Sequence, residues 1–228
     1  MTNYLLILVP IFQSLIIAAL SPLVIGIIRK MKAYLQNRVG ASVLQPYRDL
    51  LKLFAKNEVI SRDASWVFRT VPFALFAITI VLGTGIPLLV PLSFTWTGDF
   101  LIVIYLLGLS AFLIALAGMD VGSAFGGFGS SRELSMNAIT EGVLLFAVLP
   151  LVIAFRTTDL GGIAIGSYTI SAIAYLPIIL AGCAFLVALA VENARIPVDN
   201  PTTHLELTMI HEAMILEYSG KRLALVEW

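Results

Sequence analysis

The chain has 228 residues and no net charge, and it is 59% hydrophobic but only 12% charged. Soluble domains carry about 25% charged residues, so this composition excludes a soluble protein and indicates one whose solvent is lipid. The neutral balance gives no sign of a nucleic-acid partner, and the one cysteine, Cys183, excludes an internal disulfide, a cysteine-rich zinc site and a cysteine-ligated iron–sulfur cluster in this chain.

Five segments are apolar enough to cross a bilayer as helices. About 20 apolar residues span the roughly 30 Å of hydrocarbon, and a helix satisfies its own backbone hydrogen bonds there. The first segment is too long for a signal-peptide core and has no basic region before it. The expected fold is an all-α, polytopic transmembrane bundle forming one integral membrane domain over residues 1–228. The predicted spans are 4–28, 67–92, 100–118, 136–155 and 173–191.

The basic residues predict how these spans are oriented. Of the 14 lysines and arginines, all except Arg156 fall on one side if the five spans are real. Lysine and arginine concentrate in cytoplasmic loops. We therefore expect a multi-pass protein of the inner or plasma membrane, with the N-terminus outside and the basic loops in the cytoplasm.

The first cytoplasmic loop contains an amphipathic segment, residues 46–57. Pro46 suits the first turn of a helix, and apolar side chains follow it at helical spacing while most charged ones lie elsewhere around the helix. This pattern predicts a helix lying flat at the membrane surface. Two interpretations remain open: a helix that only anchors the loop to lipid, or the wall of a site at that surface.

The second cytoplasmic loop, residues 120–133, is rich in glycine. Glycine permits sharp turns and close packing, and a phosphate-binding loop is disfavoured because the Gly-Lys-Ser/Thr ending and a preceding strand are both missing. We expect a tight helix connection in which Ser131 caps the fourth span.

The third cytoplasmic region, residues 192–220, mixes charged and apolar side chains. A solvated loop is one explanation, but the interleaved leucines, isoleucines and methionines favour partial burial. Charges near membrane depth usually face a protein interior or a water-filled cavity, so we favour a proton-handling or ligand-lining role. The charged and histidine residues are Glu192, Arg195, Asp199, His204, Glu206, His211, Glu212 and Glu217.

Two further features concern individual side chains. Glu141 lies about one turn inside the fourth span, where it is either a snorkelling acid or a buried carboxyl that takes and releases a proton. The two histidines, His204 and His211, are too sparsely surrounded for a metal or haem site. We expect His211 to form a hydrogen-bonded polar cluster with Glu212 and Glu217.

Three motifs, taken in order, resemble a known family. Residues 37–40 read Asn-Arg-Val-Gly, residues 120–133 begin Asp-Val-Gly-Ser and end Ser-Arg-Glu, and residues 217–220 read Glu-Tyr-Ser-Gly. Together they resemble the quinone-chamber membrane subunit of respiratory complex I, also called NADH dehydrogenase subunit 1. They look closer to the corresponding subunit of membrane-bound nickel–iron hydrogenases and formate hydrogenlyases.

The chain also departs from the complex I pattern. Val198, Asn200, Thr202 and His204 stand where that family commonly has phenylalanine, leucine and acids. The family usually has about eight spans, whereas this chain ends at Trp228 just as residues 205–228 start to resemble another helix. The ending indicates a shortened homologue or an incomplete chain, and we expect the latter. The departures favour the hydrogenase-like branch.

The resemblance implies a non-catalytic coupling subunit of an oxidoreductase complex. It would join a soluble arm of hydrogenase-like large and small subunits, which hold iron–sulfur clusters and a nickel–iron centre, to antiporter-like membrane subunits in the lipid bilayer. It would bind no cofactor itself, with quinone as the alternative ligand. The alternatives are a complex I subunit forming the quinone-reduction chamber, and a stand-alone ion carrier or membrane anchor.

The resemblance also implies roles for individual residues. The proton path would comprise Glu133, Glu141, Glu192, Asp199, Glu206, Glu212 and Glu217. Their charge partners would be Arg132, Arg195, His204 and His211. The interface with the soluble arm, or with a quinone-like cavity, would comprise Arg38, Pro46, Arg48, Asp49, Asp120 and Tyr218.

Overall fold

The computed structural model describes residues 2–88, 97–167, 175–193 and 210–228. In this part of the chain the secondary structure is helical, and two residues, Asp99 and Asp159, form an isolated antiparallel bridge. The helices are α1 (Thr2–Leu35), α2 (Gln45–Ala55), α3 (Trp66–Gly85), α4 (Phe100–Asp120), α5 (Ala124–Phe155), α6 (Leu160–Gly166), α7 (Tyr175–Glu192), α8 (His211–Ile215) and α9 (Gly220–Glu227).

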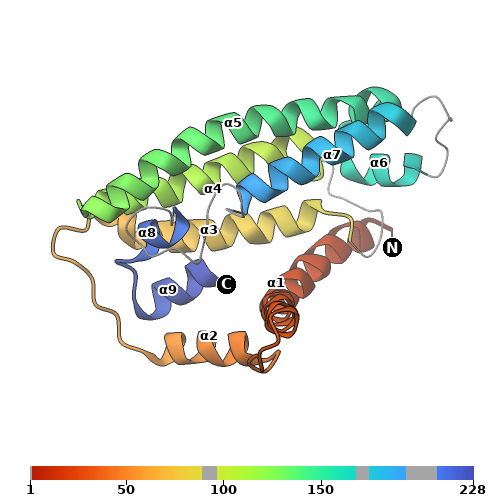
Figure 1. Cartoon of the computed structure of the whole chain (residues 1–228). Coiled ribbons are helices and arrows are strands. Elements are labelled where there is room, and N and C mark those ends of the chain that lie inside the picture. The colour runs from red at the N-terminus through yellow and green to blue at the C-terminus, as the bar shows by residue number, and fades with distance from the viewer. Residues whose placement is uncertain (1, 89–96, 168–174, 194–209) are drawn as a thin grey trace.

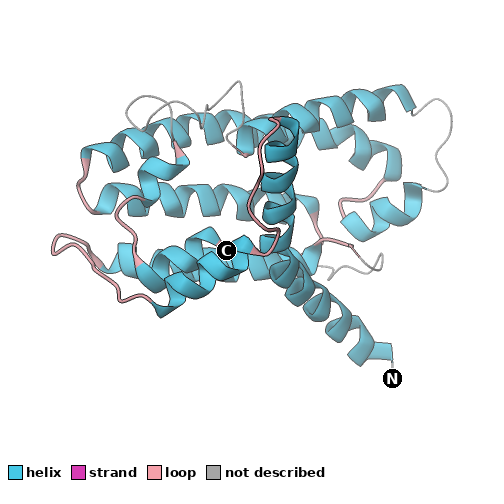
Figure 2. Ribbon diagram, turned by 60° about the horizontal axis from the view of Figure 1, so that its bottom comes forward, coloured by secondary structure: helices cyan, strands magenta, loops and turns pink. Residues whose placement is uncertain are grey.

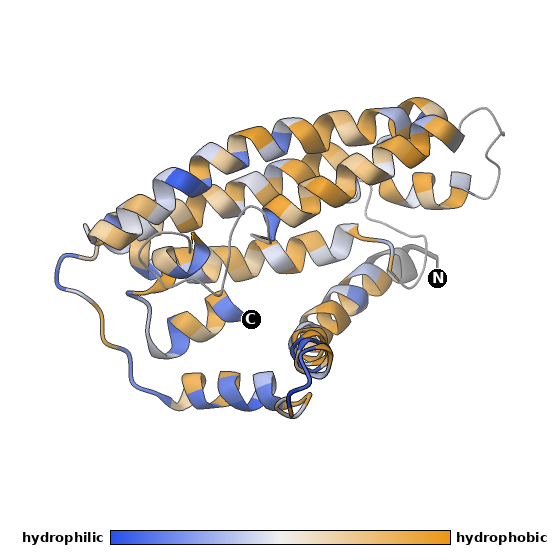
Figure 3. Cartoon of the chain, in the orientation of Figure 1, coloured by the Kyte–Doolittle hydropathy of each residue, from blue (hydrophilic) through white to orange (hydrophobic). Residues whose placement is uncertain are grey.

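The expected all-α membrane bundle is confirmed. Four helices, α1, α3, α4 and α5, are long and apolar enough to cross a membrane by length and composition, and α7 is a shorter apolar helix. Large apolar side chains on these helices are exposed, among them Phe12 (62%) and Phe146 (76%). Exposed apolar surface of this extent is what lipid, rather than water, favours. Figure 3 shows that the long helices are predominantly hydrophobic, whereas α2 carries many hydrophilic residues.

The bundle is built by neighbouring helices packing in sequence. α4 packs against both α3 and α5, α5 packs against α7, and α1 packs against α3. Figure 1 shows α4, α5 and α7 running side by side, with α3 alongside them. The N-terminal part of α1 extends away from the other helices (Figure 2).

The short C-terminal helices fill the space that the long helices leave. α8 packs against α4 and α5, while α9 packs against α2 and α3. Met214 in α8 is 1% exposed and Tyr218, between the two helices, is 4% exposed. The expectation of one helix over residues 205–228 is therefore wrong for its described part, because the chain breaks between α8 and α9 to bury Tyr218.

The glycine-rich connection differs from the sequence-based expectation. α5 begins at Ala124 rather than near residue 136, and its cap is Ser123, whose hydroxyl accepts a hydrogen bond from Gly126 N at 3.1 Å. Ser131 is therefore not the cap, and its hydroxyl donates to Phe128 O. A Cβ at Gly126 would lie 2.1 Å from the carbonyl oxygen of Gly118. Gly126 thus permits a close approach of α5 to α4, while Gly122, with φ +71°, forms the short turn between the two helices.

The second predicted span also has a different end. α3 ends at Gly85, before the predicted end at residue 92, and Thr97 packs closely there, since a Cβ at Gly85 would lie 2.0 Å from Thr97 O. The helix predicted over residues 46–57 is present as α2, with Pro46 in its first turn and Leu50 buried, while its position at the membrane surface stays a prediction. The hydroxyl of Tyr47 donates to Ala19 O of α1, which fixes α2 to the bundle.

Candidate functional site

Glu133 and His211 form a pair at the contact between α5 and α8. His211 Nε2 lies 3.7 Å from Glu133 Oε1, and the side chains are 42% and 11% exposed, respectively. This close approach depends on Gly129, one turn before Glu133, where a Cβ would lie 2.9 Å from Ile210 O. A buried carboxylate therefore faces a half-exposed imidazole, and the two attract each other when the imidazole is protonated.

Glu141 lies on the same face of α5, two turns further into the helix. Residues four apart are neighbours on a helix surface, so Glu133, Asn137 and Glu141 form one line. Asn137 Nδ2 donates to Glu141 Oε1 at 2.7 Å. A Cβ at Gly108 of α4 would lie 1.8 Å from the same oxygen. Glu141 therefore lies in the contact between α4 and α5, in space that a side chain on α4 would occupy.

Glu192, at the end of α7, completes this group. Its carboxyl group interacts electrostatically with Glu133, Glu141 and His211. The "carboxylate cluster" is defined here as these four residues, which come from α5, α7 and α8. Ionised carboxylates repel one another, so the charges of Glu133 and Glu141 act against ionisation of Glu192, whereas a protonated His211 favours it.

The cluster brings together part of the predicted proton path and not the rest. His211 pairs with Glu133, so the expected cluster of His211 with Glu212 and Glu217 is wrong: Glu217 follows the end of α8 and is exposed. Arg132 is exposed near the start of α5. Arg195, Asp199, His204 and Glu206 lie outside the described residues.

A cavity of about 510 Å³ lies between α1, α2, α8 and α9. Of the residues predicted for an interface or cavity, Pro46, Asp49 and Tyr218 line it, while Arg38 and Arg48 are exposed outside the lining. The full lining consists of Pro22, Ile25, Arg29, Pro46, Asp49, Leu50, Glu212, Ile215, Leu216, Tyr218, Leu223 and Glu227.

Sequence reasoning missed two charged residues of this cavity, Arg29 and Glu227. Burial raises the pKa of the Glu227 carboxyl; Arg29 opposes that shift, whereas Asp49 and Glu212 add to it. Four charged side chains from four helices therefore line the same cavity. They are Arg29, Asp49, Glu212 and Glu227. Arg29 occurs in the basic segment after the first span, and the positive-inside pattern is enough to explain an arginine there. Nothing else in the sequence indicated that Arg29 would line a cavity.

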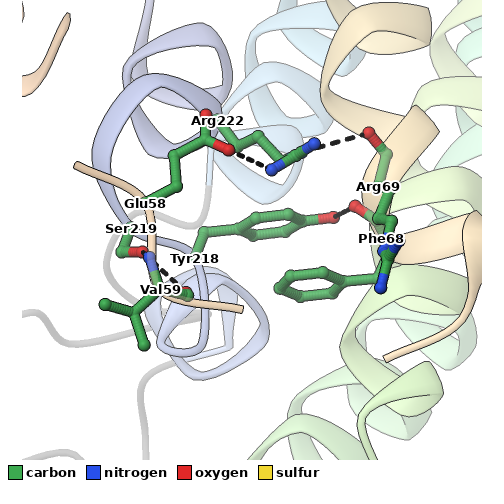
Figure 4. Close-up of polar contacts among 7 residues, drawn as sticks. All are labelled: Glu58, Val59, Phe68, Arg69, Tyr218, Ser219 and Arg222. Atoms are coloured by element: carbon green, nitrogen blue, oxygen red, sulfur yellow. Dashed lines mark hydrogen bonds and ion pairs between the residues drawn. The ribbon is translucent and has the colours of Figure 1, made fainter. Parts of the chain in front are cut away.

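The Glu-Tyr-Ser-Gly motif fixes the start of α9 to the segment before α3 (Figure 4). Tyr218 stacks on Phe68 with ring centroids 4.0 Å apart, and its hydroxyl donates to Phe68 O at 3.0 Å. The Ser219 hydroxyl accepts from Val59 N and donates to Val59 O, at 2.9 and 2.8 Å. Gly220 has φ +55° and packs where a Cβ would lie 3.0 Å from two backbone oxygens. Residues 218–222 are called the "218–222 anchor" below.

Charged side chains complete the 218–222 anchor and its surroundings. Arg222 pairs with Glu58 and donates from Nε to Arg69 O at 3.3 Å. Burial raises the pKa of the Tyr218 phenol, and the nearby Asp120 adds to this shift, so the hydroxyl stays protonated as a donor. Asp120 itself accepts hydrogen bonds from Ser65 N, Ser65 Oγ and Phe68 N, at 2.8, 2.7 and 3.3 Å. It therefore joins the end of α4 to the start of α3 and does not line the cavity.

Comparison with known proteins gives consistent matches over the whole chain. A family model described as NADH dehydrogenase matches residues 6–228. Formate hydrogenlyase subunit 4 of Escherichia coli (strain K12) is 31% identical over 223 residues, 97% of this chain and 72% of that protein. Hydrogenase-4 component C of the same organism is 36% identical over 217 residues, 95% of this chain and 68% of that protein.

Two further matches extend the comparison. A subunit of the NADH-quinone oxidoreductase of Syntrophotalea carbinolica (strain DSM 2380 / NBRC 103641 / GraBd1) is 31% identical over 207 residues, 85% of this chain and 61% of that protein. A chain in the structure of the membrane-bound sulfane sulfur reductase (MBS), an archaeal respiratory membrane complex, superimposes with a TM-score of 0.80 at 24% identity. The superposition covers 100% of this chain and 73% of the reductase chain, which shows a shared fold.

Proposed function

Because the chain belongs to the NADH dehydrogenase family, we propose that it is the membrane-embedded coupling subunit of a complex I-like, hydrogenase-type redox complex. It anchors a soluble arm of hydrogenase-like large and small subunits, in which the iron–sulfur clusters and a nickel–iron centre reside. It conducts protons toward antiporter-like membrane subunits. The complex lies in the cell membrane, with the basic loops of this chain in the cytoplasm.

The carboxylate cluster is the observation that carries this proposal. A charged group at the centre of a membrane helix costs roughly 2.5–3.5 kcal/mol or more. Glu141 lies inside the predicted span 136–155, in the contact between α4 and α5, so this cost applies to it. Glu133 and Glu192 flank the predicted spans and interact with it or with each other. A functional role for Glu141 accounts for its presence at such a position. Carboxyl groups that share protons can pass them along the bundle, from Glu133 near the start of α5 to Glu141 within it.

The 218–222 anchor supports a route by which a docked arm could act on the cluster. It binds residues 58–69, on the predicted cytoplasmic side, to the start of α9. Residue 218 follows α8 closely, and α8 begins with His211. A displacement of the segment before α3 would therefore move α8 and change the distance between His211 and Glu133. Such a change alters the pairing of Glu133 and so its tendency to hold a proton.

The decisive experiment separates electron transfer from proton transfer. Inverted membrane vesicles containing the complete complex are supplied with reduced methyl viologen, and hydrogen evolution and vesicle acidification are measured together. Glu133→Gln and Glu141→Gln should each lower proton uptake by about tenfold or more, because a positioned proton-transfer group contributes roughly 10²–10⁴-fold in rate, while hydrogen evolution stays nearly unchanged. Asp63→Asn, an exposed acid in the loop before α3, is the control. Unchanged uptake in both glutamine variants rules the proposal out.

The cavity supports a second candidate, a subunit that forms a quinone-reduction chamber. Its volume of about 510 Å³ lies in the common range for small-molecule sites, and the NADH-quinone oxidoreductase subunit of Syntrophotalea carbinolica is a relative. However, such sites are lined mainly by apolar groups, and four charged side chains face this one. Inhibitor-sensitive quinone reduction by the same membranes, without hydrogen evolution, would favour this candidate. Purification of the chain alone would favour a stand-alone ion carrier or membrane anchor.

A further inference from the structure

His211 connects a buried carboxylate with an accessible surface. The Glu133 side chain is 11% exposed, the His211 side chain is 42% exposed, and Nε2 and Oε1 are 3.7 Å apart. An imidazole is the side chain whose charge changes between about pH 5 and 8. A half-exposed imidazole beside a sheltered carboxylate is therefore an arrangement that can exchange protons with the surroundings on behalf of the carboxylate.

The hydrogen bonding of His211 argues against a purely structural role. Buried ring nitrogens of histidine usually have a partner. Within the described ranges, Nδ1 of His211 is buried without one, and Nε2 faces Glu133 at a distance longer than a direct hydrogen bond of about 2.7–3.2 Å. A histidine kept only for stability would be expected to have both nitrogens satisfied.

α8 contributes residues both to the cavity and to the carboxylate cluster, to which His211 belongs. The next residue, Glu212, lines the cavity together with Asp49 and Glu227. α8 is also held against α4. Met214 of α8 is 1% exposed and packs closely on Gly118 of α4, where an added Cβ would lie 3.2 Å from the Cβ of Met214. One short helix thus presents an acid to the cavity and an imidazole to Glu133.

Building on the proposed function, we infer that His211 is the residue that passes protons between the surface beside this cavity and Glu133. In its neutral form, with the proton on Nδ1, Nε2 accepts a proton from the exposed side and forms an N–H bond. That bond then breaks as the proton moves to Oε1 of the Glu133 carboxylate and forms an O–H bond. The imidazole returns to its neutral form. The side chains must approach by about 0.5–1 Å for direct transfer.

The surrounding titratable groups set the charge that His211 experiences. α5 contributes Glu133 and Glu141, α7 contributes Glu192, and α8 itself contributes Glu212. α4 also packs against α8, and its Asp120 is hydrogen-bonded to the start of α3. Since the groups of the cluster are acidic, a proton on the imidazole is attracted toward the carboxylates and not repelled from them.

The test uses the same vesicles and compares His211→Gln with Glu133→Gln. Glutamine keeps a hydrogen-bonding group near Nε2 but does not exchange protons at neutral pH. His211→Gln should lower proton uptake by about tenfold or more with little change in hydrogen evolution.

Chemical rescue separates the relay from a structural role. In His211→Ala, added imidazole should restore proton uptake, while the same imidazole should leave Glu133→Gln unchanged. If Glu133→Gln loses uptake but His211→Gln keeps it, the relay is wrong and the proposed function stands. If neither variant loses uptake, both fail. Loss of uptake in His211→Ala that imidazole does not restore, together with lower thermal stability, would show that His211 only supports the fold.

Discussion

The carboxylate cluster and the 218–222 anchor differ in how their side chains are bonded, although one member of the cluster, His211 in α8, lies just before the anchor in the chain. In the anchor, Tyr218, Ser219 and Arg222 all have hydrogen-bond partners in residues 58–69. In the cluster, the Glu133 carboxylate faces Nε2 of His211 at 3.7 Å, and Nδ1 of His211 has no partner among the described residues. Glu141 accepts one hydrogen bond, from Asn137 at 2.7 Å. The Glu-Tyr-Ser-Gly motif thus builds a rigid support, while the pair of Glu133 and His211 is bonded more loosely.

The largest effect on stability is expected at the centre of the anchor. Tyr218→Ala removes a ring that stacks on Phe68 and is 4% exposed, and deletion of a buried aromatic side chain costs about 3–5 kcal/mol. Thermal unfolding of the detergent-solubilised complex should show this loss. Tyr218→Phe keeps the ring and loses only the bond to Phe68 O, so about 1 kcal/mol is expected. Equal losses in both variants would mean that the stacking contributes little.

A smaller effect is expected at the crossing of α4 and α5, which places the cluster. Gly126→Ala puts a Cβ against the backbone oxygen of Gly118, and overpacking of this kind costs about 1–3 kcal/mol. Gly127→Ala is the matched control, since a Cβ there meets nothing within 4 Å. It should be neutral, or stabilising by up to about 1 kcal/mol through helix propensity. Thermal unfolding of both variants checks the comparison, and a neutral Gly126→Ala would contradict it.

The ion pair at the edge of the anchor should contribute less. The Arg222 and Glu58 side chains are 18% and 24% exposed, so we expect a coupling energy of about 1 kcal/mol, near the upper end for accessible pairs. A double-mutant cycle with Arg222→Gln and Glu58→Gln measures this energy from thermal unfolding. A coupling energy indistinguishable from zero would show that the backbone bonds alone hold α9.

The smallest effect on stability is expected in the carboxylate cluster itself. Glu133→Gln keeps the shape of the side chain and removes a charge that repels Glu192, so the expected change is within about 1 kcal/mol and includes a gain. Thermal unfolding should therefore barely distinguish this variant from the wild type, although its proton uptake falls. A loss as large as that of Tyr218→Ala would show that Glu133 serves the fold.

The sequence predicted the membrane helices and the chemically unusual residues, but not how those residues pair. Glu141 was recognisable because it is an acid inside an apolar segment, whereas its position depends on Gly108, which looked unremarkable among apolar neighbours. The tight connection predicted over residues 120–133 is shorter than expected, and α5 begins earlier, because glycine marks both turns, as at Gly122, and close helix contacts, as at Gly126. A turn glycine and a helix-contact glycine are distinguished only by the residue packed against them, which for Gly126 is Gly118 on α4.

Composition and periodicity by themselves determined that this chain is a helical membrane protein, because the hydrophobic effect and backbone hydrogen bonding act on every stretch of sequence locally. The tertiary structure decided that His211 meets Glu133 and that Arg29 and Glu227 share a cavity. These residues lie far apart in the chain, and their meeting depends on how closely the helices cross. The distance between two crossing helices is set by the side chains of both helices at the crossing. A pattern within one segment of sequence does not contain the residues of the other helix.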